Sequence, residues 1–136
     1  MSTCSCRYKC TCIIAALIAA IIIGVIASFL QITAAITITP AFLWTLFGIG
    51  VGLLAVLLLA TSEMHNAHVG WCQCTTLNAV LIGLLGTVLF AVVLLGVGIV
   101  ATSVTSAVLV GLLLFSFSFA LSTLACHIRA IANCGD

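Results

Sequence analysis

Eight cysteines are the side chains of this sequence best suited to chemistry, and they lie near both chain ends and in one central segment. They are Cys4, Cys6, Cys10, Cys12, Cys72, Cys74, Cys126 and Cys134. Thiols form disulfides, bind soft metal ions, exchange with other thiols or accept acyl chains. The first three reactions require sulfur atoms that lie close together, so the elements carrying these cysteines must bring the three regions to one place.

Disulfide crosslinking is the favoured interpretation of this cysteine cluster. The number of cysteines is even, and the segments that carry them are too short to bury a core of their own, which is typical of structures that rely on covalent crosslinks. Two cysteines separated by one residue bridge each other poorly, because a disulfide requires a particular Cα separation and dihedral angle. Each Cys-x-Cys pair is therefore expected to reach two separate partners, within the chain or in a neighbouring molecule.

A soft-metal site is the alternative interpretation. His65, His68, Cys72 and Cys74 lie within one ten-residue segment, and His127 lies near the C-terminus. Thiolate and imidazole groups suit Zn or Cu(I), so the alternative function is metal binding or transport. Because the spacing matches no zinc signature, the favoured interpretation requires no cofactor.

Two further thiol reactions are less well supported. Thiol–disulfide exchange commonly uses a Cys-x-x-Cys arrangement with a lowered thiolate pKa, and the sequence lacks this spacing. Acylation of cysteines near the membrane requires a host that performs it, and a lipid chain adds little anchoring to a protein that already spans the membrane.

Composition indicates that lipid surrounds most of the chain. Of its 136 residues, 65% are hydrophobic and 4% are charged, and the mean hydropathy is +1.55. A soluble domain needs several times more charge, and a net charge of +1 gives no field that would attract nucleic acid. Runs without an ionisable side chain, each near the length of about 20 residues that spans a bilayer, cover 13–35, 41–60, 77–101 and 107–125. We therefore predict an all-α, four-helix transmembrane bundle in a lipid bilayer.

The four runs form a single integral-membrane domain, 1–136, made of two tandem helical hairpins. Its predicted parts are a Cys-rich N-terminal arm (1–12), hairpin 1 (13–60), a His/Cys loop (61–76), hairpin 2 (77–125) and a tail (126–136). A displacement of 62 positions brings Cys10 onto Cys72, Gly24 onto Gly86 and His65 onto His127. This internal repeat predicts two copies related by a pseudo-twofold axis along the membrane normal.

Four crossings return the chain to its starting side, so both termini and the central loop are expected on one side of the membrane. Arg7, Lys9 and Arg129 all lie on that side, which predicts a cytoplasmic location. This orientation conflicts with disulfide formation, because the cytoplasm keeps thiols reduced. A signal peptide is the competing interpretation of the first run, which is longer than the usual apolar region of such peptides.

Small residues at four-residue spacing predict close helix packing, which in lipid depends on van der Waals contact and hydrogen bonding. The candidate packing residues are Ala16, Ala20, Gly24, Ser28, Gly48, Gly52, Gly83 and Thr87. We assign those of the first and third helices to contacts within the protomer. Whether Gly48 and Gly52 pack within or between protomers stays open.

The sequence offers little for catalysis or transport. The apolar runs contain no ionisable residue of the kind that marks substrate and proton pathways, and the only carboxylates are Glu63 and Asp136. Gln31 and Asn78 lie near helix ends, where we expect them to meet lipid headgroups. The predicted function is that of a non-enzymatic structural membrane protein, a homo-oligomer or larger assembly crosslinked by its one-sided cysteine cluster.

Overall fold

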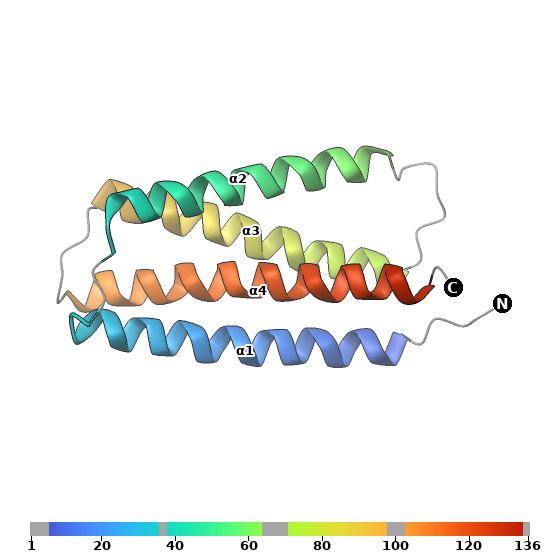
Figure 1. Cartoon of the computed structure of the whole chain (residues 1–136), viewed down its shortest axis with the longest axis horizontal. Helices are drawn as coiled ribbons and strands as arrows, with labels where there is room; N and C mark the ends of the chain where they lie inside the picture. The colour runs from blue at the N-terminus through green and yellow to red at the C-terminus, as the bar shows by residue number, and fades with distance from the viewer. Residues whose placement is uncertain (1–5, 36–37, 64–70, 98–102, 135–136) are drawn as a thin grey trace.

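The computed structural model of the chain contains four long helices in the part that it describes (Figure 1). They are α1 (Cys6–Ile32), α2 (Pro40–Glu63), α3 (Trp71–Val97) and α4 (Val104–Cys134). The structure describes residues 6–35, 38–63, 71–97 and 103–134, and the side chains of 11–35, 38–59, 77–97 and 103–129. Each helix includes a segment long and apolar enough to cross a membrane. The prediction of an all-α, four-helix membrane bundle is confirmed.

All four helices extend beyond the apolar runs at the end of the bundle that carries the cysteines, α2 by the three residues up to Glu63. α1 begins at Cys6 and α3 at Trp71, while α4 continues to Cys134. Hydrophobicity determines which residues lie in lipid, whereas a helix continues until a residue interrupts its backbone hydrogen bonds. Proline and glycine are absent from 6–23 and from 112–134, so nothing stops these helices at the membrane surface. Much of the predicted arm, loop and tail is therefore helical.

Backbone hydrogen bonds and a left-handed residue end α1 before the connection to α2. The amide of Ala34 donates to the Gln31 carbonyl (3.2 Å) and that of Ala35 to the Leu30 carbonyl (3.1 Å), which together form a Schellman motif. Ala34 has a φ of 53°, a left-handed conformation that costs a non-glycine residue free energy. The next helix starts with Pro40 in its first turn, and Thr39 accepts hydrogen bonds from the amide of Phe42. Thr39 therefore caps the start of α2.

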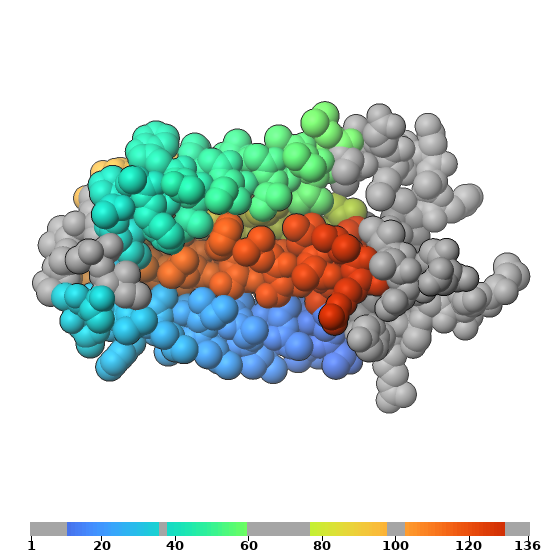
Figure 2. All heavy atoms as spheres, viewed as in Figure 1, coloured from blue at the N-terminus to red at the C-terminus, as the bar shows by residue number. Residues whose placement is uncertain are grey.

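The helices contact one another in the order α1, α4, α3, α2 (Figure 1). α1 packs along α4, α4 along α3, and α3 along α2. Figure 2 shows the surface of α4 lying between those of α1 and α2. A twofold arrangement of the two hairpins would pair α1 with α2 in the way that α3 pairs with α4, but α1 and α2 make at most marginal contact over the described residues. The repeat is therefore not reproduced as a symmetric set of contacts.

The core of large side chains is built by α2, α3 and α4. One cluster joins Leu46 of α2, Leu94 of α3 and Leu113 of α4, and a second joins Val80 and Leu84 of α3 with other residues of the same three helices. α1 contributes to neither cluster. Its buried side is a stripe of mostly small residues, namely Ala16, Ala20, Gly24, Ala27 and Gln31. α1 is thus held through close backbone approach, while its large side chains point outward.

Candidate functional site

A pair of cysteines joins the first helix to the last. Cys12 of α1 and Cys126 of α4 lie at disulfide-bonding distance, with their Cα atoms 6.2 Å apart. The two helices run antiparallel, so the second turn of α1 lies beside the last part of α4 (Figure 1). Both side chains are half-buried. This pair connects positions 114 residues apart in sequence and crosslinks the one helix that lies outside the core of large side chains.

The described helices bring seven of the eight cysteines to the same end of the bundle. Cys6, Cys10 and Cys12 lie in the first two turns of α1, Cys72 and Cys74 in the first turn of α3, and Cys126 and Cys134 in the last three turns of α4. Figure 1 shows that the start of α1, the start of α3 and the end of α4 lie together. Cys4 lies outside the described residues. Only for Cys12 and Cys126 does the structure describe the side chains.

The alternative metal site falls largely outside the described part of the chain. His65 and His68 lie outside the described residues, and the side chains of Cys72 and Cys74 are not described. His127 lies in α4, next to Cys126, and is half-buried. Among the side chains that the structure describes, no three potential ligands gather in one place.

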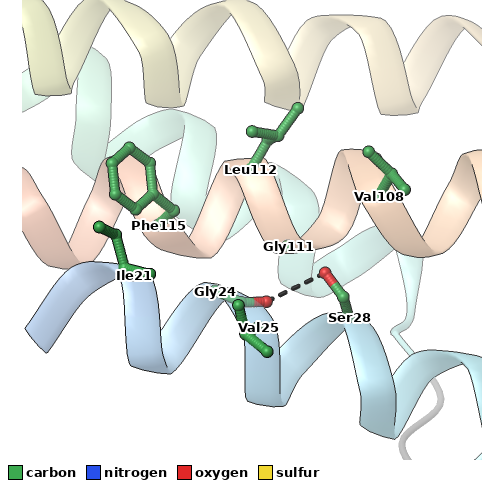
Figure 3. Close-up of a pocket in the computed structure, with 8 residues that line it drawn as sticks. All are labelled: Ile21, Gly24, Val25, Ser28, Val108, Gly111, Leu112 and Phe115. Atoms are coloured by element: carbon green, nitrogen blue, oxygen red, sulfur yellow. Dashed lines mark hydrogen bonds between the residues drawn. The ribbon is translucent and has the colours of Figure 1, made fainter. Parts of the chain in front are cut away.

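α1 and α4 approach each other closely at two glycines, Gly24 and Gly111 (Figure 3). A Cβ atom added to Gly111 would overlap the Ser28 hydroxyl and lie 2.9 Å from the Gly24 carbonyl oxygen. A Cβ added to Gly24 would lie 3.0 Å from both the Gly111 carbonyl oxygen and the Phe115 Cβ. The Ser28 hydroxyl donates to the Gly24 carbonyl oxygen at 3.0 Å. Only residues without a side chain allow this crossing, which brings the helices together within their apolar spans.

The contact between α3 and α4 is equally close. A Cβ added to Gly83 would lie 3.0 Å from the backbone nitrogen of Ala120, and one added to Gly86 would lie 2.9 Å from the Ser116 hydroxyl oxygen. Thr87 is fully buried and donates to the Gly83 carbonyl at 2.8 Å. Gly86 was not among the candidate packing residues, although the repeat relates it to Gly24. Both glycines face α4, so the repeat contained the signal for this contact.

Two candidate packing glycines have no neighbour within the protomer. A Cβ added to Gly48 or Gly52 of α2 would meet nothing within 4 Å among the described residues. Gly50, between them, lies against Val88 of α3 instead. The G-x-x-x-G pair of α2 therefore lies on the exposed side of this helix.

The expectation that Gln31 meets lipid headgroups is wrong, because the structure buries this side chain. Gln31 is only 3% exposed and ends the buried stripe of α1, whereas Asn78 is exposed. The Gln31 Oε1 and the Ser106 hydroxyl are buried without a hydrogen-bond partner among the described residues. Gln31 lies seven residues, or two helical turns, after Gly24 and therefore on the same buried side of α1, and this periodicity outweighs its position near the helix end.

Comparisons with protein-family models, with curated proteins and with solved structures give no match for this chain.

Proposed function

We propose that this protein is a non-enzymatic structural component of a membrane, which self-associates and whose assembly is crosslinked through disulfides at its cysteine-rich end. The pairing of Cys12 with Cys126 carries the proposal, because it joins two cysteines at the end of the bundle where the helices place five others. One such bond holds α1 on the bundle. The remaining cysteines are then available for bonds within or between protomers.

Helix geometry supports a role for Cys10 that differs from that of Cys12. Positions 10 and 12 are about 200° apart around an α-helix, because successive residues are about 100° apart. Because position 12 lies on the side of α1 that faces α4, position 10 lies at a register position on the opposite side of this helix. The same argument separates positions 72 and 74 of α3. Each Cys-x-Cys pair is suited to linking two different neighbours, as a crosslinked assembly requires.

The exposed small residues of α2 support self-association. Gly48 and Gly52 leave a side-chain-free surface where an added Cβ would meet nothing within 4 Å among the described residues. Glycines at this spacing allow two membrane helices to approach closely, and a second copy of α2 would supply the missing contact. The proposal thus combines a noncovalent contact in the membrane with covalent crosslinks at the cysteine-rich end.

The proposal places the cysteine-rich end in contact with an oxidising environment. Disulfides persist outside the cytoplasm and are rare within it. The lysine and arginine count predicts a cytoplasmic end, but it rests on three residues. We therefore expect either an outward-facing end or oxidation after the protein leaves the reducing compartment.

Electrophoresis of membranes treated with a thiol-blocking reagent tests the proposal. We expect a ladder of species without reductant that collapses to the monomer with reductant, and we expect a Zn or Cu chelator to leave the ladder unchanged. Replacing Gly48 and Gly52 together by leucine is expected to shorten the ladder, whereas replacing the exposed Ile82 by leucine serves as a control. A single monomeric band without reductant would contradict crosslinking, and collapse on chelation alone would favour metal binding.

A further inference from the structure

A groove lies on the surface of the bundle where α1 crosses α4 (Figure 3). Its volume is about 310 Å³, and it lies within the segments of both helices that are apolar enough to cross a membrane. Gly24 and Gly111 face each other at the crossing. Ile21 and Phe115 lie together at one end of the groove, and Ser28 and Val108 lie at the other. The groove exists because glycines replace side chains at its centre while larger residues stand at both ends.

The residues that line the groove favour a hydrocarbon ligand over a polar one. Its lining contains no charged residue, and its only polar side chain is Ser28. That hydroxyl already donates to the Gly24 carbonyl oxygen at 3.0 Å, so it offers no free donor to a ligand. Water needs several polar partners in such a space, and an apolar cavity without them stays dry. A polar or charged ligand would likewise lose its hydration without compensation.

The size and position of the groove fit a lipid chain. An apolar cavity of about 150 Å³ is large enough to bind a benzene ring, and this groove has about twice that volume. Ile21 and Val108 line it at opposite ends and are 47% and 51% exposed. At this depth in a membrane the surrounding medium is acyl chain, so no additional partner has to be recruited.

We propose that the groove binds a lipid acyl chain, which packs against both α1 and α4. The chain replaces the van der Waals contacts that Gly24 and Gly111 cannot supply from side chains. Because α1 is held mainly by α4, a chain in contact with both helices stabilises the docking of α1. This site is independent of the cysteines and of self-association through α2.

Photolabelling of the full-length protein in phosphatidylcholine vesicles tests the site. A fraction of the lipid carries a diazirine in the middle of one acyl chain, and mass spectrometry locates the labelled residues. We expect labelling between residues 21–28 and 108–115 to exceed that at Leu85 and Leu89, which are exposed on α3. Val108→Trp and, separately, Ile21→Trp fill the groove from exposed positions, so that each removes the excess labelling. Leu89→Trp, at an equally exposed position, leaves it unchanged.

Two results would overturn the proposal. Equal labelling of the groove and of the exposed residues of α3 would mean that the lipid there is only bulk solvent. Protection of the groove from label in the wild-type protein, together with crosslinks between protomers at Val108, would identify the occupant as a second copy. Either result leaves the disulfide ladder unaffected, so a failure of the lipid site is distinguishable from a failure of the proposed function.

Discussion

Replacing Gly111 by alanine should force α1 away from α4. The new Cβ overlaps the Ser28 hydroxyl and lies 2.9 Å from the Gly24 carbonyl oxygen and 3.2 Å from the Ser28 Cβ. The hydroxyl can rotate to another staggered position, but the carbonyl belongs to the backbone of α1 and can move only with the helix. Overpacking of this kind costs about 1–3 kcal/mol. Against it stands the higher helix propensity of alanine, about 1 kcal/mol relative to glycine.

Two control variants separate these effects. Gly96→Ala adds a methyl group where nothing lies within 4 Å, so it carries the propensity gain without the overlap. Ser28→Ala combined with Gly111→Ala removes the hydroxyl overlap but leaves the contact with the Gly24 carbonyl. Taken together, these two effects lower the free energy of unfolding by up to about 2 kcal/mol for Gly111→Ala. We expect it to recover in part in the double variant and to stay level or rise slightly for Gly96→Ala.

The free energy of unfolding is measured by titrating the detergent-solubilised protein with sodium dodecyl sulfate and following its circular dichroism. The measurement uses a Cys12→Ser background, so that no covalent bond holds α1 in place. If Gly111→Ala proves as stable as Gly96→Ala, then α1 and α4 do not approach as closely as described, and the reasoning from the glycine crossing is refuted.

Three further substitutions test separate parts of the fold in the same titration. Ala34→Gly should raise the free energy of unfolding by about 1 kcal/mol, because glycine adopts the left-handed φ of 53° without strain; an unchanged or lower value would contradict the described turn. Cys12→Ser in the otherwise unaltered protein should lower the free energy of unfolding by about 2–4 kcal/mol. Adding Cys126→Ser should lower it little further, because the same disulfide is already lost. Additive losses would show that each cysteine has another partner. Thr87→Val should stay within about 0.6 kcal/mol, since the buried hydroxyl donates only to the carbonyl of Gly83 in its own helix; a large loss would reveal a contact between helices.

The number of helices was predictable because lipid imposes a simple requirement. Every segment that crosses it must be long, apolar and internally hydrogen-bonded, and the four runs met this condition. The helix ends were not predictable in the same way. Cys6 and Cys134 lie beyond the apolar residues, where hydropathy no longer distinguishes a helix from a loop.

The helix that packs against α1 was also not predictable from the sequence. The spacing of Ala16, Ala20 and Gly24 predicts that one side of α1 packs closely, and these residues are buried. A small-residue stripe indicates how near a neighbour comes, but it does not identify the neighbour. The short connection to α2 favours a hairpin, yet α1 packs along α4. The pairing of Cys12 with Cys126 depends on this choice, which is why the cysteine cluster was predictable as a group and its connectivity was not.

Cyanogen bromide cleavage of the unreduced protein tests most directly whether the two halves of the chain are covalently joined, as the pairing of Cys12 with Cys126 requires. The reagent cleaves after methionine, and the chain contains only Met1 and Met64, so it separates the segment with Cys12 from the segment with Cys126. With free thiols blocked beforehand, we predict that the two large fragments migrate together until reductant is added. Fragments that separate without reductant would contradict a disulfide between the two halves, and with it the crosslinked end on which the proposed function rests.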